Sequence, residues 1–222
     1  MILPAFRPAL RSAGTGRSWK STFISLTKKR NSERSINCSQ RASLNIIKTM
    51  TSYKELLKDI RAFVFDYDGV LTDGSVITLD DGEAYRVTGV KDGYALQLAR
   101  KKGYLVAVIS GARAECMVHR LKALRITDYF LGVENKLETF RNYLRDHSID
   151  PAHVLFMGDD IPDYEVMLEA GLPACPSDAA EEIKNVAKYI SHQPGGKGCV
   201  RDVIEQVLKM QGKWMNDDGY KW

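Results

Sequence analysis

The stretch AFVFDYDGVLT, residues 62–72, constrains the fold more than any other part of the chain. Its first four residues are apolar, and Asp66 and Asp68 follow them before Gly69. An apolar run of this length that ends in charge is typical of a strand buried on both faces of a sheet. In open α/β sheets the ligand lies at the carboxyl ends of the strands, where both aspartates would stand. We therefore expect a sheet with a site built around Asp66 and Asp68.

Strand and helix patterns alternate along the rest of the chain. Further buried strands are predicted at residues 105–109, 129–131, 154–157, 172–174 and 189–190. Helices are predicted at 53–58, 92–102, 114–124, 136–147, 179–187 and 200–210, with one more running through 165–168. This alternation predicts an α/β fold in which helices cover both faces of a parallel sheet.

Two local features stand between the first strand and the second. Short β-prone runs at 75–79 and 84–87 flank an Asp-Asp-Gly turn, which predicts a β-hairpin that can stand over the site as a flap. The helix that follows has Asp92 at its start, and we expect this side chain to cap the helix N-terminus.

Charge is distributed unevenly. Residues 1–49 hold ten of the 32 Lys and Arg residues but only Glu33 of the 28 acidic ones, so the net charge of +4 hides a negatively charged remainder. This distribution argues against a nucleic-acid-binding protein. The basic, serine-rich leader is either an organelle transit peptide or the result of a mis-assigned start upstream of Met50. In both cases we expect a disordered segment 1–49, a folded domain 50–212 and a flexible tail 213–222.

The compartment is predicted from apolar runs and cysteines. No run approaches the roughly 18 apolar residues that cross a bilayer, so we expect no membrane partner. The four cysteines form no CxxC pair, which favours reduced thiols over disulfides or a thiolate metal site; they are Cys38, Cys116, Cys175 and Cys199. We expect a cytoplasmic protein, or an organellar one if the leader is a genuine transit peptide.

Three of the predicted strands end in polar residues that a parallel sheet brings to one edge. These residues are Asp66, Asp68, Ser110, Asp159 and Asp160, with Asp163 one helical turn further on. Carboxylates gathered in this way repel one another unless a cation neutralises them, and a hard divalent cation with oxygen ligands does so. Mg²⁺ is favoured because proteins bind it through a few carboxylates together with substrate phosphate. The Ser110 hydroxyl and Lys136 would hold the remaining phosphate oxygens.

These motifs resemble those of the haloacid dehalogenase superfamily of phosphotransferases. The four motifs occur in the family's order at residues 66–70, 110, 136 and 158–163. The resemblance implies a three-layer, Rossmann-like fold. It also implies that Asp66 is the nucleophile that forms an aspartyl-phosphate, and that Asp68 protonates the leaving oxygen and later activates water.

The same resemblance implies a metal site and a reaction type. Mg²⁺ would be held by Asp66, the backbone carbonyl of Asp68 and Asp159, with Asp160 or Asp163 in support. Dehalogenases lack the metal and the second acid, so Asp68 favours phosphoryl transfer over carbon–halogen cleavage. The intervals between the motifs leave no room for a cap domain. An open site must accept a large substrate or be closed by a neighbouring subunit.

A closer resemblance is to the 3-deoxy-D-manno-octulosonate 8-phosphate phosphatases. It rests on residues 87–94, 110–113, Arg120 and 195–202, and it covers roughly residues 55–212. It implies hydrolysis of that phosphorylated sugar acid in lipopolysaccharide sugar biosynthesis, by a homotetramer with shared active sites. The sugar acid would be gripped by residues that match the family's pattern, namely Gly89, Lys91, Asp92, Gly93 and Arg120.

One departure and two alternatives stand beside this interpretation. Many relatives have arginine directly after the glycine of the serine motif, where this chain has Ala112, so the role of Arg113 in binding the substrate carboxylate is open. A nine-carbon, sialic-acid-type 9-phosphate phosphatase would share the fold, motifs and tetramer. A non-catalytic assembly domain of the same fold is the other alternative, against which the intact Asp66 and Asp68 argue.

Overall fold

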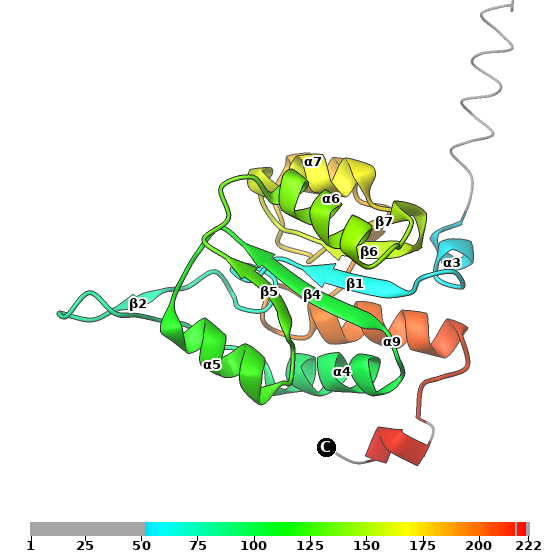
Figure 1. Ribbon diagram of the computed structural model, residues 1–222, viewed down its shortest axis with the longest axis horizontal. Helices are drawn as coiled ribbons and strands as arrows, with labels where there is room; N and C mark the ends of the chain where they lie inside the picture. The colour runs from blue at the N-terminus through cyan, green and yellow to red at the C-terminus, as the bar shows by residue number, and fades with distance from the viewer. Residues whose placement is uncertain (1–51, 216, 221–222) are drawn as a thin grey trace, which may run out of the picture. The chain divides into compact units, whose positions relative to one another are not determined.

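A computed structural model describes residues 52–215 and 217–220 (Figure 1). The leader expected at residues 1–49 lies outside the described residues, and both interpretations of it stay predictions. Six strands form one parallel sheet in the order β5-β4-β1-β6-β7-β8. Their bounds are β1 Ala62–Phe65, β4 Leu105–Ser110, β5 Asp128–Leu131, β6 Val154–Met157, β7 Leu172–Cys175 and β8 Tyr189–Ile190.

Helices cover both faces of this sheet. Their bounds are α3 Tyr53–Leu56, α4 Val90–Lys101, α5 Glu115–Ala123, α6 Lys136–Asp146, α7 Tyr164–Glu169, α8 Glu181–Val186 and α9 Cys199–Met210. Within the described residues, the short 3₁₀ helices are η1 Pro151–His153, η2 Ile161–Asp163 and η3 Asp217–Tyr220. In Figure 1, α6 and α7 lie on one side of the sheet, and α4 and α9 lie on the other. The predicted three-layer α/β fold is confirmed.

Strand β1 is the centre of both halves of the core. Its four side chains are fully buried and alternate between the faces, because successive side chains of a strand point in opposite directions. Phe63 and Phe65 pack in the cluster that includes α4 and α9, whereas Ala62 and Val64 pack in the cluster that includes α6 and α7. The apolar run at 62–65 is therefore explained by burial on two faces, as expected.

The predicted hairpin is present and is shorter than the β-prone runs suggested. Strands β2 (Ile77–Thr78) and β3 (Ala84–Tyr85) pair antiparallel and form a sheet of their own. The arm extends away from the body of the domain in Figure 1. Several of its apolar side chains are exposed, among them Ile77, Tyr85 and Val87.

Asp92 does not cap its own helix, so that prediction is wrong. Helix α4 begins at Val90, and its N-cap is Gly89. The Asp92 Oδ1 atom instead accepts a hydrogen bond of 2.8 Å from the backbone N–H of Arg201, in the first turn of α9. Asp92 thus stabilises the N-terminus of a helix more than one hundred residues further along the chain.

The described part of the tail contacts the domain. Trp214 packs against the core that includes α4 and α9, and its ring meets that of Tyr94 edge to face. The Tyr94 hydroxyl also donates a hydrogen bond to the backbone carbonyl of Gly219. The mobility expected for residues 213–222 stays a prediction. Among residues 52–215 and 217–220, no helix is both long and apolar enough to cross a membrane.

Candidate active site

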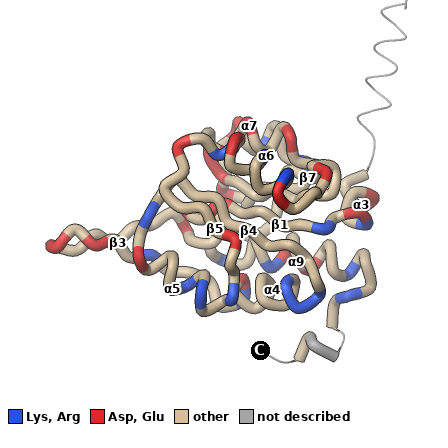
Figure 2. Tube along the Cα trace, in the orientation of Figure 1, with Lys and Arg blue, Asp and Glu red and all other residues tan. Residues whose placement is uncertain are grey.

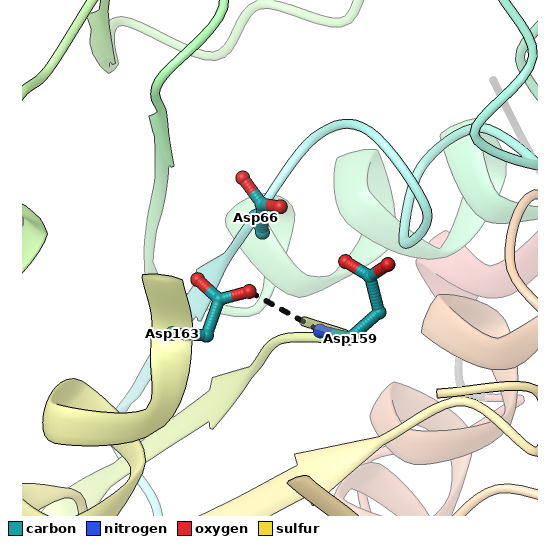
Figure 3. A group of neighbouring side chains, drawn as sticks. All are labelled: Asp66, Asp159 and Asp163. Atoms are coloured by element: carbon teal, nitrogen blue, oxygen red, sulfur yellow. Dashed lines mark hydrogen bonds between the residues drawn. The ribbon is translucent and has the colours of Figure 1, made fainter. Parts of the chain in front are cut away.

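Three carboxylates meet at the carboxyl edge of the sheet. Asp66 directly follows β1, Asp159 lies just after the neighbouring strand β6, and Asp163 ends η2. One ligand oxygen of each lies within 4.8 Å of the others (Figure 3). The parallel register pairs Phe65 with Met157, so the chain segments that carry the first two carboxylates leave the sheet side by side.

Lys136 places one positive charge among these carboxylates. It is the first residue of α6, a position set by the preceding Asn135, whose side chain caps the helix. Its Nζ atom donates a 2.7 Å hydrogen bond to Asp163 Oδ1. The same Nζ lies 2.9 Å from Asp66 Oδ1, but outside hydrogen-bond geometry, so this second contact is an ion pair only. The side chains of Lys136, Asp66 and Asp163 are 8%, 9% and 1% exposed, whereas Asp159 is partly exposed.

One lysine does not neutralise three carboxylates, of which Asp66 and Asp163 are buried and Asp159 is partly buried. Burial, with the charge of Asp163 second, raises the pKa of Asp66 to about 7, although Lys136 opposes the shift. Burial and then the charge of Asp66 raise the pKa of Asp159 to about 8. Burial also raises the pKa of Asp163. The site therefore lacks positive charge when all three carboxylates are ionised.

The donor set suits a hard divalent cation. Asp66 Oδ1 and Asp159 Oδ1 are buried oxygens without a hydrogen-bond donor among the described residues. A buried acceptor without a partner is costly, and a cation bound between such oxygens satisfies it. Carboxylate oxygens at this spacing are ligands that Mg²⁺ accepts. The expected metal site thus fits the residues present.

Gly69 is required where the chain turns away from β1. Its φ is +83°, in the left-handed region that favours glycine. A Cβ atom at this position would lie 2.0 Å from Asp159 Oδ2. The loop after Asp68 can therefore pass against Asp159 only because residue 69 has no side chain.

Asp68 has a partner that the sequence analysis missed. Arg86, the residue after β3, donates from Nε to Asp68 Oδ1 at 2.7 Å and from Nη2 to Asp68 Oδ2 at 2.9 Å. Hydrogen bonds from its guanidinium to Asp68 raise the pKa of Arg86. No local signal marks this contact, because its position depends on how the hairpin folds back; the one clue is a basic residue at the end of a predicted flap.

The remaining predicted catalytic and metal residues are placed as follows. Ser110 ends β4, the neighbour of β1, and is buried, with its Oγ accepting a hydrogen bond from Ala112 N. Asp160 is exposed and lies outside the group of three carboxylates. Of the two acids left open for metal support, Asp163 is therefore the one in the group, where Lys136 and the backbone N–H of Asp159 hold its carboxylate.

Comparison with known proteins identifies the family. A family model for haloacid dehalogenase-like hydrolases matches residues 133–201. A Salmonella typhi protein, 3-deoxy-D-manno-octulosonate 8-phosphate phosphatase KdsC, is 36% identical over 156 residues, which are 70% of this chain and 83% of that protein. The chain belongs to the 3-deoxy-D-manno-octulosonate 8-phosphate phosphatase family. The family suggested by the sequence motifs is thereby confirmed.

Solved structures of 3-deoxy-D-manno-octulosonate 8-phosphate phosphatases share the fold. The Moraxella catarrhalis phosphatase, described in complex with magnesium ion, phosphate ion and a KDO molecule, has a TM-score of 0.71 at 32% identity; 73% of this chain and 94% of that chain are covered. The cobalt-bound Haemophilus influenzae phosphatase has a TM-score of 0.71 at 28% identity, with 74% and 98% covered.

The residues expected to bind substrate from this phosphatase family's pattern fall into two groups. Four of them line one small cavity of about 10 Å³ under Tyr67, namely Gly89, Asp92, Gly93 and Arg120. Within it the Arg120 guanidinium donates to the backbone carbonyl of Gly89 at 3.4 Å. Lys91 and Arg113 are exposed and lie outside this cavity. The substrate-binding roles of all six stay predictions.

Proposed function

We propose that this protein hydrolyses 3-deoxy-D-manno-octulosonate 8-phosphate to the free sugar acid and phosphate, a step toward lipopolysaccharide sugar. The observation that carries the proposal is the group of three carboxylates in which Lys136 contacts Asp66 and Asp163. Among the described residues, Oδ1 of Asp66 and Oδ1 of Asp159 accept no hydrogen bond there. Family membership supports the choice of substrate, since relatives at this identity bear that enzyme's name.

The metal requirement follows from the carboxylates. Asp66, the backbone carbonyl of Asp68 and Asp159 would hold Mg²⁺, with Asp163 in support. When bound, Mg²⁺ neutralises charge on the phosphoryl oxygens and on the carboxylates. Lys136 and the Ser110 hydroxyl would hold the other phosphoryl oxygens through hydrogen bonds.

Two half-reactions use the aspartates in turn. In the first, an Asp66 carboxylate oxygen attacks phosphorus, the bond between phosphorus and the sugar oxygen breaks, and Asp68 gives its proton to that oxygen. In the second, a water oxygen attacks phosphorus, the bond to Asp66 breaks, and Asp68 takes the proton from the water. Phosphate leaves, and both aspartates return to their starting forms.

A substrate panel tests the proposal. We expect phosphate release from 3-deoxy-D-manno-octulosonate 8-phosphate with Mg²⁺, and loss of that release in EDTA that Mg²⁺ restores. The purified protein is assayed in parallel with a nine-carbon, sialic-acid-type 9-phosphate and with simple sugar phosphates. Equal or better kcat/KM on the nine-carbon acid would replace the proposed substrate. No release from any of them would leave only the assembly-domain alternative.

We also propose that four copies assemble with shared active sites. Exposed apolar side chains along the hairpin support this, among them Val76 at 46% and Ile77 at 55%, because an arm of this kind is covered when copies pair. Figure 2 shows acidic residues gathered at the hairpin tip, so the apolar part lies along its stem. Light scattering should give the mass of a tetramer, and Ile77→Lys should dissociate it. A fully active monomer would contradict the shared site.

The cysteines bear on the compartment. We propose the cytoplasm, because Cys116, Cys175 and Cys199 are free thiols and two of them are buried. Thiols kept reduced in this way suit a reducing compartment.

A further inference from the structure

Arg86 and Asp68 form a bidentate ion pair in the site. The guanidinium donates two hydrogen bonds, of 2.7 and 2.9 Å, one to each carboxylate oxygen. The Arg86 side chain is 7% exposed and that of Asp68 is 27% exposed. A bidentate ion pair fixes the plane of the carboxylate as well as its distance from the guanidinium. The Thr72 hydroxyl also donates to Asp68 Oδ1, over a long distance of 3.5 Å.

Stability alone does not account for this pair. Ion pairs that keep partial access to solvent contribute little to the free energy of unfolding. The acid held here is the one that transfers protons in the proposed reaction, whereas the arginine comes from the hairpin, which belongs to a separate sheet. The contact therefore joins the hairpin to the loop after β1, at the carboxyl group whose orientation affects the reaction.

We propose that Arg86 is a positioning residue that orients the Asp68 carboxylate to take a proton from water during hydrolysis of the aspartyl-phosphate. The inference rests on the proposed function. Both Asp68 oxygens accept hydrogen bonds from Arg86, so the guanidinium fixes the plane in which the carboxyl group meets the water. In that step the water oxygen bonds to phosphorus, the phosphorus–Asp66 bond breaks with its electron pair returning to Asp66, and Asp68 receives the proton. An error of about 1 Å in such a group can cost roughly 10²-fold in rate.

Arg86→Met tests the inference, because it removes the guanidinium and keeps an unbranched stem. The probe is 4-nitrophenyl phosphate with Mg²⁺ in stopped flow, since nitrophenolate leaves without needing a proton. We expect a burst of about one nitrophenolate per active site, then steady turnover that is about 10- to 100-fold slower than in the unchanged protein. KM should fall together with kcat, because the aspartyl-phosphate accumulates. Arg86→Lys should recover part of the rate, since it keeps one donor and the charge.

Arg141→Met is the matched control. Arg141 makes a similar two-donor contact with Glu169, through Nε at 2.9 Å and Nη2 at 2.7 Å, on an exposed surface. Its kcat should equal that of the unchanged protein. Circular dichroism checks that every variant is folded, and Arg86→Lys gives the decisive reading if Arg86→Met does not fold.

Three results would overturn the role of Arg86. These are an unchanged kcat in both variants, a lower kcat without a burst, and a raised KM at constant kcat, which would make Arg86 a substrate-binding residue. Failure of the proposed function looks different. The unchanged protein would then release no phosphate from any phosphate ester, or it would prefer the nine-carbon acid in the substrate panel.

Discussion

Asp66→Asn is expected to abolish phosphate release while leaving the fold intact. Amide nitrogen and oxygen replace the attacking carboxylate, so no aspartyl-phosphate forms, and loss of a covalent nucleophile typically costs at least about four orders of magnitude in kcat. The fold should survive because the change removes a buried carboxylate that repels two neighbouring ones. Phosphate release with saturating Mg²⁺ measures the first effect, and thermal unfolding in EDTA at pH 8 measures the second.

The expected pattern separates a lost nucleophile from a damaged protein. In EDTA at pH 8 the Tm of the Asp66→Asn protein should equal or exceed that of the unchanged protein. The increase in Tm on adding Mg²⁺ should shrink, because one carboxylate ligand is gone. Asp146→Asn changes the same residue type at the exposed end of α6 and should leave both kcat and Tm unchanged. Full Mg²⁺-dependent release from the Asp66→Asn protein would refute the assignment of the nucleophile.

The sheet and the carboxylate group could be predicted because local pattern and topology determine them. Strand 62–65 reads as apolar at every position since both of its faces are buried, and its end is marked by the change to aspartate. Asp66 and Asp159 each follow a strand, and parallel strands have their carboxyl ends at the same edge of the sheet. Because β1 and β6 are neighbours, the two residues come together. Strand and helix ends moved by at most two residues, as expected where caps rather than patterns set them.

The contacts that the sequence did not predict join segments far apart in the chain. Capping rules are local, so they assigned Asp92 to its own helix, whereas packing of α4 on α9 brings it to Arg201. The Arg86–Asp68 pair depends on the direction in which the hairpin leaves the sheet, which no short pattern encodes. Lys136 was expected only to hold phosphate, because its distances to two carboxylates follow from how α6 packs beside η2.

Lys136→Met is expected to destabilise the metal-free protein strongly, and more at high pH than at low pH. At pH 8 the change leaves Asp66 and Asp163 buried without their cation, a loss of about 3 kcal/mol or more. For a domain of this size that corresponds to a fall in Tm of roughly 10 °C. Thermal unfolding of both proteins in EDTA, at pH 5.5 and at pH 8, measures this difference in Tm.

The pH dependence follows from the raised pKa values. The folded-state pKa of Asp66, about 7, and that of Asp159, about 8, exceed the ordinary value of 3.8, so the folded state binds more protons than the unfolded state between these limits. Stability without metal therefore falls as pH rises from about 4 through 8. Lys136 lowers both pKa values, so its removal raises them further. The stability of the metal-free protein then falls more steeply with rising pH. At pH 5.5 these two carboxyl groups are protonated in the fold, and the loss of Lys136 should be less than half as large.

Added Mg²⁺ and a change at a surface lysine show whether the charge of Lys136 or its packing accounts for the loss of stability. Bound Mg²⁺ supplies positive charge to the same carboxylates, so it should recover part of the Tm that Lys136→Met loses at pH 8. Lys184→Met removes a 3.1 Å ion pair with the exposed Glu181 and should lower stability by less than about 1 kcal/mol at either pH. If Lys136→Met lowers Tm equally at both pH values and Mg²⁺ does not restore it, the aliphatic stem of Lys136 stabilises the protein through packing. The lysine charge would then not be what stabilises the buried carboxylates.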